Sequence, residues 1–413
     1  MAPPDSAQRA GLLSAEAALE LTARGRTQAR EGRLQEALAT FLAAVERDER
    51  ALDAHLGIYE VAQILRQSEL ALAHQAAAIA LAPVQSTPAS EREDYALLVP
   101  CAPGPYTANT PVDLLFDSRF VTLHRWYVDP AGDVPPLPRH DAVFVAIGES
   151  DDAAPRLAAV EKLATMPAGA AALNGPLLNR PELIARLGRV AFAETFANAR
   201  HCRVVTTTRI SRERYAADGF PTPHIVRPVG SHGGHGLERI DDDAQRAAYV
   251  AGPGAGADEL YVAPYLDYRS ADGYFRKYRI VFVGGEPFPF HLAISPNWMV
   301  HYYNAPMGEH PWMRDEEHAF LARIEDVFRG ELAEALRETA ALLPLDYVGI
   351  DCAIGRDGKL LIFEADNALI IHTLDDPVLY GYKHRYVPRI LTALDWMVRR
   401  RISGAPGQAT VRA

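Results

Sequence analysis

The chain has 413 residues, enough for two or three domains at about 150 residues each. Hydrophobic residues make up 48% and charged residues 23% of the sequence, so we expect neither a disordered nor a fibrous protein. The net charge of −11 excludes non-specific binding of nucleic acid, because that binding requires basic residues that neutralise phosphates.

The three cysteines, Cys101, Cys202 and Cys352, lie far apart and form no CxxC pair. This spacing is typical of a reducing compartment and indicates neither a disulfide framework nor a cysteine-based zinc site. The first residues lack the basic start and apolar stretch of a signal peptide. No run approaches the ~20 apolar residues of a membrane-spanning helix, so we expect a cytoplasmic protein with no membrane partner.

Residues 15–83 carry Ala and Leu at intervals of three and four, which predicts helices. Ala37 and Ala44 are followed 34 residues later by Ala71 and Ala78. A period of about 34 residues is that of tetratricopeptide helix pairs, and residues 1–90 resemble two such repeats.

The second repeat departs from that pattern, because Gln75 stands where an aromatic residue is usual. An unrelated bundle of α-hairpins is the alternative. Two repeats rarely suffice alone, so we expect this segment to pack on the next domain or on a second copy. A homodimer and a peptide or protein partner of the helices are therefore both left open.

The stretch 84–94 is polar and rich in turn residues, as in a linker. Short apolar runs and helical patterns then alternate, which predicts an α/β domain with a largely parallel sheet. The runs are 95–99, 120–123 and 141–147, and the helical patterns are 153–164 and 180–198.

From residue 224 the sequence predicts paired strands joined by glycine-rich turns, at 224–229, 260–268 and 279–283. Residues 316–343 read as one or two amphipathic helices around Gly330. A last strand pair, 347–354 and 359–364, is joined by a turn at 356–358, and a flexible tail follows Arg401.

A run of glycines, GSHGGHG at 230–236, directly follows the strand predicted at 224–229. Glycine lets backbone N–H groups approach an anion closely. The run is neither a P-loop, because the Gly-Lys-Ser/Thr ending is absent, nor a Rossmann fingerprint, because acidic residues follow it. Taken alone, it is more typical of a flexible surface turn.

Two acidic segments lie near the ends of the last strand pair, Gly349-Ile350-Asp351 and FEADN at 363–367. Antiparallel pairing across the short turn can place Asp351 beside Glu364. Converging carboxylates suit Mg²⁺, whereas solvated acidic strand edges are the alternative. Asp351 and Glu364 interrupt or end apolar runs, where a charge needs a polar pocket, so we favour a metal–nucleotide site.

The order of these motifs resembles the ATP-grasp ligase superfamily over roughly residues 140–395, nearest to glutamate-adding and D-alanine–D-alanine ligases. LNGP at 173–176 is similar to an asparagine turn of that superfamily. The resemblance implies a multidomain chain: an all-α tetratricopeptide-like module at 1–90, an α/β pre-ATP-grasp domain at 91–200, an α+β ATP-grasp domain at 201–400, and a tail at 401–413.

The resemblance also implies the cofactors ATP and Mg²⁺, as two ions, with Mn²⁺ as an alternative. Asp351 and Glu364 match the magnesium carboxylates of the family. Asp366 stands where an asparagine usually completes the second metal site, and the neighbouring Asn367 is the alternative ligand.

Further roles follow from the same resemblance. Arg279, beside Lys277, matches the arginine that steadies the transferred phosphoryl group. Arg227 matches a nucleotide-binding lysine. Tyr265 and Leu266 fall where a hinge backbone binds adenine, although Pro264 replaces a usual polar residue. The glycine loop that would cover the β- and γ-phosphates contains Ser231, His232, Gly233 and Gly234.

Weaker substrate candidates surround Arg279. They are Arg276, His291, Ser295 and His301. Solvent-facing charge explains Arg276 equally well, and core packing explains the polar–aromatic stretch after the strand.

The machinery implied is that of an ATP-dependent carboxylate–amine ligase, which forms an amide or peptide bond through an acyl phosphate and releases ADP and phosphate. Its substrates would be small-molecule or peptide carboxylates and amines. Two alternatives stay open: a kinase that phosphorylates a hydroxyl, and a non-catalytic nucleotide-binding module with a peptide-binding helical scaffold.

Overall fold

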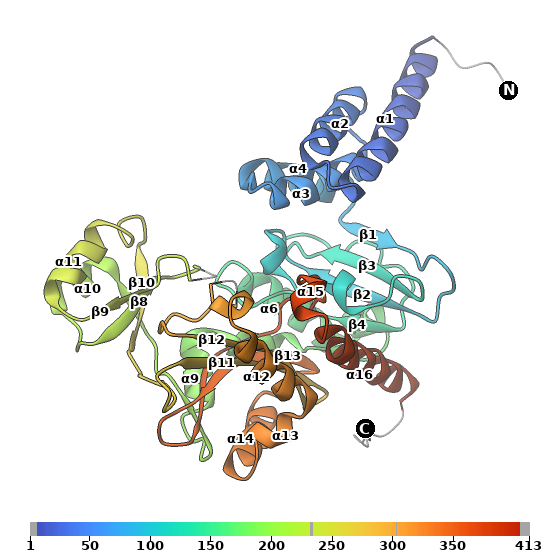
Figure 1. The fold of residues 1–413 in the computed structure, drawn as a ribbon. Helices are drawn as coiled ribbons and strands as arrows, with labels where there is room; N and C mark the ends of the chain where they lie inside the picture. The colour runs from blue at the N-terminus through green and yellow to red at the C-terminus, as the bar shows by residue number, and fades with distance from the viewer. Residues whose placement is uncertain (1–5, 232–233, 303, 405–413) are drawn as a thin grey trace.

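The computed structural model describes residues 6–231, 234–302 and 304–404. Four helices form an N-terminal helical module that projects from the rest of the chain (Figure 1). They are α1 (Ser6–Arg30), α2 (Leu34–Arg47), α3 (Leu52–Ile64) and α4 (Ser68–Leu81). The all-α module is confirmed, and its tetratricopeptide identity stays a prediction.

Close helix packing in this module depends on glycine. A Cβ atom at Gly25 would lie 2.7 Å from the Phe41 ring, and one at Gly57 would lie 2.5 Å from it. Phe41 is itself almost fully buried. The first helix pair is therefore built around one aromatic ring that two glycines accommodate.

The second unit is an α/β domain around a five-stranded sheet of order β1-β3-β2-β4-β5. Its strands are β1 (Val84–Thr87), β2 (Tyr95–Cys101), β3 (Val121–Tyr127), β4 (Ala142–Phe144) and β5 (Leu177–Leu178). All pairings except β1–β3 are parallel, which confirms the predicted sheet type. Its short helices are η1 (Tyr106–Ala108), α5 (Val112–Leu115), α6 (Ala154–Thr165), α7 (Pro167–Ala172), α8 (Pro181–Ile184), η2 (Ala185–Leu187) and α9 (Arg189–Thr195).

The sequence had predicted a linker at residues 84–94, but the first part of this stretch is a strand. Val84–Thr87 forms β1, which pairs antiparallel with β3 at the edge of the sheet. An edge strand tolerates polar residues because one side faces solvent, and its polarity therefore concealed the strand. The predicted helix at 180–198 is likewise divided, since Gly188 separates η2 from α9.

A small lobe, comprising an antiparallel four-stranded sheet and two helices, stands apart at one side of the molecule (Figure 1). Its strand order is β7-β10-β8-β9. The elements are β7 (Thr208–Ser211), α10 (Arg212–Asp218), β8 (His224–Pro228), β9 (Glu238–Ile240), α11 (Asp243–Ala251) and β10 (Glu259–Pro264). It has its own apolar core, which includes Tyr215, Val226 and Tyr249.

The central sheet has the order β12-β11-β13-β14-β6. Its strands are β6 (Cys202–Val204), β11 (Phe275–Val283), β12 (Glu286–Ser295), β13 (Tyr347–Ile354) and β14 (Leu360–Asp366). The remaining helices are η3 (Pro306–Gly308), α12 (Pro311–Ala322), α13 (Ile324–Val327), α14 (Glu331–Leu342), α15 (Pro377–Tyr380) and α16 (Lys383–Ser403). Side chains of α12 and α14 share a core with one face of this sheet.

Two local predictions for this part of the chain are confirmed. The helical region divides at Gly330, which has a φ of +58° before α14. The turn between β13 and β14 uses Gly358 at a φ of +76°, a conformation that glycine adopts without strain. At the C-terminal end, α16 continues past Arg401 to Ser403, so the predicted tail begins later than expected.

All three cysteines are buried and free. Burial raises the pKa of Cys101 and of Cys202 to about 12. No helix in the described part of the chain is long and apolar enough to cross a bilayer.

Candidate functional site

Polar side chains cross the middle of one face of the central sheet in strand register. Arg279 of β11 pairs with Asp351 of β13, and Asp351 pairs with Glu364 of β14. On the outer side, Arg279 pairs with His291 of β12. These four residues are called the polar row: His291, Arg279, Asp351 and Glu364.

The polar row faces away from α12 and α14. The alternate residues Tyr278 and Ile280 of β11 belong to the core shared with these helices, and the Tyr278 ring lies 5.0 Å from that of Phe320. Because side chains alternate along a strand, Lys277 and Arg279 project from the opposite face.

Asp351 is enclosed by two cations. Lys277 Nζ lies 2.8 Å from Asp351 Oδ2, and Arg279 Nε lies 2.6 Å from Oδ1, with Nη2 3.0 Å from Oδ2. Only 3% of the Asp351 side chain is exposed. Burial alone would raise the pKa of Asp351, but Arg279 and Lys277 outweigh it and hold that pKa well below its usual range.

Glu364 is more open, with 40% of its side chain exposed, and has one close cation. Arg189 is the first residue of α9, and its Nη2 lies 2.6 Å from Glu364 Oε2. Burial would raise the pKa of Glu364, but Arg189, helped by Lys277 and Arg227, lowers it. Three cationic side chains therefore act on the Glu364 carboxylate, and Arg189 is the one in contact with it.

Asp366 and Glu149 form the acidic end of the site. The Asp366 side chain is exposed, but the surrounding protein removes much of the water near it. This desolvation, together with repulsion from Glu364, raises the pKa of Asp366 to about 6. Glu149 follows β4, and burial, with repulsion from Asp151 and Asp366, raises its pKa to about 7. Asp366 Oδ1 accepts a hydrogen bond from the Ala368 N–H at 2.7 Å, and no ion pair to Asp366 occurs within the described ranges.

The three carboxylates predicted as metal ligands do not form a ready-made cage. Within residues 6–231, 234–302 and 304–404, no group of three His, Cys, Asp or Glu side chains is arranged around one metal position. Both oxygens of Asp351 already bind cations. Glu364 and Asp366 fit Mg²⁺ better, because they are hard oxygen donors two residues apart on one strand with more negative charge than neighbouring cations.

Asn367, the alternative ligand, points elsewhere. Its Nδ2 donates to the Ile147 carbonyl at 2.9 Å, and its Oδ1 is buried with no hydrogen-bond partner among the described residues. It ties the end of β14 to the α/β domain.

The side chain of Arg227 holds the start of the glycine loop. Arg227 Nε donates to Ser231 Oγ at 3.0 Å, and a second N–H donates to the Ser231 carbonyl. Burial and the nearby Arg189 lower the pKa of Arg227 to about 10. His232 and Gly233 lie outside the described residues.

Gly234 brings this loop against His301, in the segment after β12. A Cβ atom at Gly234 would lie 2.5 Å from His301 Nε2, and Gly234 has a φ of +79°, so a residue with a side chain would be strained there. Burial, and then Lys277, lowers the pKa of His301. Thus His301 lies between the loop and the charges of the central sheet.

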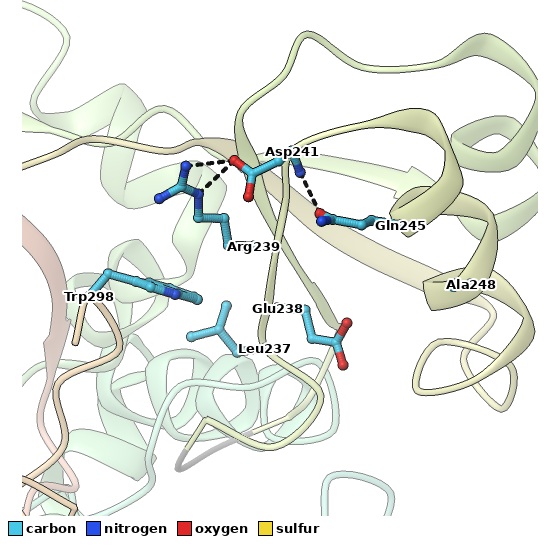
Figure 2. A pocket seen from close by; sticks show the side chains of 7 residues that line it. All are labelled: Leu237, Glu238, Arg239, Asp241, Gln245, Ala248 and Trp298. Atoms are coloured by element: carbon cyan, nitrogen blue, oxygen red, sulfur yellow. Dashed lines mark hydrogen bonds and ion pairs between the residues drawn. The ribbon is translucent and has the colours of Figure 1, made fainter.

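The predicted hinge adjoins a pocket between the small lobe and the segment after β12 (Figure 2). The Arg239 guanidinium lies 4.0 Å from the centre of the Tyr265 ring, which meets Trp298 edge-on at 6.0 Å. The Tyr265 N–H donates to the Pro223 carbonyl and is thus already used within the protein, and a role for Leu266 stays a prediction. The pocket is lined by Leu237, Glu238, Arg239, Asp241, Gln245, Ala248 and Trp298.

Two of the weaker candidates are not brought into this site. Arg276 lies on the opposite face of β11, where it bonds to Glu316 of α12 at 2.6 Å and to Asp272 at 2.8 Å. Ser295 is buried at the end of β12, and its hydroxyl accepts a hydrogen bond from the Asn297 N–H. Strand alternation explains the first difference, and a local turn explains the second.

His291 is placed in the row but is shut off from solvent. Its Nδ1 is buried without a hydrogen-bond partner among the described residues, and its ring lies 4.8 Å from that of Tyr302. Burial, and then Arg279, holds the pKa of His291 well below its usual range. The ring is therefore neutral at physiological pH.

Sequence reasoning missed Arg189 and Glu149. Neither belongs to a motif of the last strand pair, and both are brought to it by packing of the α/β domain. The only available signal was position: Glu149 directly follows an apolar strand, at the carboxyl edge of a parallel sheet where ligand-binding groups gather.

No protein-family model and no curated protein matches the chain. Solved structures do. D-alanyl-alanine synthetase A from Vibrio cholerae has 11% identity and a TM-score of 0.46, over 76% of this chain and 100% of that one. A RimK-domain ATP-grasp protein from Sphaerobacter thermophilus has 14% identity and a TM-score of 0.42, over 73% and 99%.

D-alanine–D-alanine ligase from Coxiella burnetii has 12% identity and a TM-score of 0.38, over 65% of this chain and 71% of that one. The chain is thus similar to ATP-grasp and D-alanine ligase structures, the group that its motifs resemble. TM-scores below 0.5 describe a partial likeness, and the roles of individual residues rest on the contacts of this chain.

Proposed function

We propose that the chain is an ATP-dependent carboxylate–amine ligase that forms an amide or peptide bond and releases ADP and phosphate. The observation that carries the proposal is the set of cations anchored on two carboxylates of one sheet face. Lys277 and Arg279 bind Asp351, and Arg189 binds Glu364. A glycine loop that is held by a fourth cation, Arg227, lies against His301, whose pKa Lys277 helps to lower.

This charge distribution suits a nucleoside triphosphate. Four cationic side chains from three elements, α9, β8 and β11, can neutralise a polyphosphate, and backbone N–H groups of a glycine loop add further donors. Asp351 fixes Lys277 and Arg279 in place before a ligand binds, so little reorganisation is needed when charge develops on the transferring group.

The anchored cations retain unused donors. Arg279 binds Asp351 through Nε and Nη2, which leaves Nη1 for a ligand. Lys277 uses one of its three ammonium protons on Asp351. We assign these donors to the transferred phosphoryl group. Glu364 and Asp366 would hold Mg²⁺, which would neutralise the β- and γ-phosphates.

The reaction would proceed in two balanced steps. A substrate carboxylate oxygen attacks the γ-phosphorus, the bond to the β–γ bridging oxygen breaks, and ADP leaves. The amine nitrogen then attacks the acyl carbon, phosphate leaves with the C–O electrons, and the nitrogen loses a proton. Closure of the glycine loop near His301 would exclude water, which otherwise hydrolyses the acyl phosphate.

An ADP-release screen tests the proposal. The full-length protein is incubated with ATP, Mg²⁺ and a panel of amino acids, dipeptides and simple carboxylates, with and without hydroxylamine. An acyl phosphate gives a hydroxamate with hydroxylamine and an amide with the true amine. AMP with pyrophosphate would contradict the mechanism, and a phosphoester without hydroxamate would identify a hydroxyl kinase instead. Binding of ATP without turnover across the panel would favour a non-catalytic module.

A further inference from the structure

The helical module contacts the α/β domain through the loop at 102–110, which follows β2. The Tyr59 hydroxyl donates to the Gly104 carbonyl at 2.8 Å, and Gln75 Oε1 accepts from the Gly104 N–H at 2.8 Å. Tyr59 is 8% exposed and Gln75 is 3% exposed. Both backbone groups of one residue are therefore held by the module.

The loop itself is tightly closed. Asn109 brackets Ala102, since its Nδ2 donates to the Ala102 carbonyl at 2.8 Å and its Oδ1 accepts from the Ala102 N–H at 2.7 Å. Gly104 has a φ of +148°, and a Cβ atom there would lie 2.8 Å from Ala108 Cβ. The two ends of the loop are therefore tied together at Ala102 and Asn109, and Gly104 lies close to Ala108.

That other end is bonded to the strand end that carries Asp366. Thr110 Oγ1 donates to the Asn367 carbonyl at 2.8 Å, and the Gly148 N–H donates to the Ala108 carbonyl at 2.9 Å. Asn367 is fully buried and directly follows Asp366. Hydrogen bonds, joined by short stretches of backbone, thus connect α3 and α4 to the acidic end of the site.

Tyr59 and Gln75 occupy positions that correspond, one repeat later, to two residues of the first helix pair. Tyr59 and Gln75 stand 34 positions after Gly25 and Phe41, which pack on each other in the first helix pair. In the second pair both positions carry side chains that bond to the neighbouring domain instead. The apparent degradation of the second repeat is a contact with the α/β domain.

We propose that Tyr59 and Gln75 are positioning residues of the active site: the helical module holds the loop 102–110, and the loop holds Asn367 and, through it, the Asp366 carboxylate. The effect on turnover rests on the proposed ligase function, whereas the effect on local structure does not.

Amide hydrogen exchange of the full-length protein tests the structural part. Tyr59→Phe removes the hydroxyl donor, and Gln75→Met removes the amide acceptor at similar volume. In the double variant we expect exchange at 365–370, including the Ala368 N–H that binds Asp366, to accelerate about five-fold or more, with 260–283 unchanged. Thr22→Val is the matched control, because it deletes a buried hydroxyl that bonds only within α1.

Steady-state kinetics test the functional part. In the double variant we expect kcat to fall at least about ten-fold, because small misplacements at a reacting centre are costly. KM for ATP should stay within about two-fold, since among the described residues no hydrogen bond joins the glycine loop or the hinge to the loop 102–110. Thr22→Val should match the wild type in both.

Several outcomes would overturn the proposal. These are unchanged exchange at 365–370, acceleration confined to 102–110, or an unchanged kcat despite accelerated exchange at 365–370. If no substrate is ever ligated, the exchange result still decides the coupling, and the proposed function fails separately. If the double variant does not fold, Tyr59→Phe alone decides, because it removes a single oxygen atom.

Discussion

Two parts of the candidate site, here called the closed end and the open end, have opposite charge balances. At the closed end, Asp351 is almost fully buried and binds two cations. At the open end, Glu364 binds one cation, and Asp366 has no ion pair within the described residues. Glu149 adds a further carboxyl near Asp366.

This difference separates two tasks. At the closed end one carboxylate holds two cations, so Asp351 can keep Lys277 and Arg279 in fixed positions while positive charge remains for an anionic ligand. The open end has excess negative charge, which raises the pKa of Asp366 and of Glu149. An incomplete charge balance marks the place where an external cation would gain most.

The largest expected effect concerns the open end. Glu364→Gln should lower kcat on the order of 10²–10³-fold, the range for loss of one preorganised electrostatic group. Its free energy of unfolding should change by less than about 1 kcal/mol, because exposed ion pairs contribute little. ADP release at saturating substrate and thermal unfolding measure the two quantities, and wild-type turnover would refute the assignment of Glu364.

Breaking the closed end should affect stability as well as rate. Asp351→Asn leaves two largely buried cations without their carboxylate, so we expect a loss of about 3 kcal/mol in the free energy of unfolding. Because the folded pKa of Asp351 is depressed, its stabilisation is present above the ordinary carboxylate pKa and is lost as pH falls through the lower folded value. Urea titration should show a gap between wild type and variant that is constant from neutral pH to pH of about 5. A gap below about 1 kcal/mol would mean that the pair is not buried as described.

Glu149 should give a pH signature with the opposite sign. Its folded pKa is raised to about 7, so its stabilisation is fully present below the ordinary carboxylate pKa and is lost as pH rises through about 7. Wild-type protein should therefore lose melting temperature between weakly acidic and weakly alkaline pH, and Glu149→Gln should reduce that loss by about 2–4 °C. Identical pH profiles for the two proteins would remove Glu149 from the open end.

The smallest effect is expected on the opposite face of β11. Arg276→Gln breaks the ion pairs with Glu316 and Asp272 but touches no member of the polar row. Turnover should stay within about two-fold, and the unfolding free energy should fall by about 1 kcal/mol. A large loss of turnover would mean that position relative to the sheet face does not separate functional from structural charges.

The last strand pair was predictable from the sequence because its information is local. A short turn sets the register of an antiparallel pair, and next to the turn the structure pairs Ile354 with Leu360. Continued without a break, that register would place Asp351 opposite Phe363, but an irregularity between Asp351 and Cys352 shifts it by one residue and brings Glu364 opposite Asp351. The irregularity has no comparable local signal.

Contacts between units were not predictable in the same way. Arg189 reaches Glu364 across 175 positions of sequence, and Thr110 reaches Asn367 across 257. Such pairs depend on how three separately patterned segments pack. Gln75 shows the same limit, since a repeat pattern identifies it as a departure but cannot name Gly104 as its partner.

Because every thiol is buried, the folded protein should react poorly with thiol reagents. A protonated, inaccessible sulfur is a poor nucleophile. A cysteine introduced at an exposed position would then be the one site of labelling, with no native residue to replace. Glu213→Cys on α10 and Arg337→Cys on α14 fall on strongly exposed side chains. A spin or fluorophore pair at these two positions would report the distance between the small lobe and the central sheet as nucleotide is added.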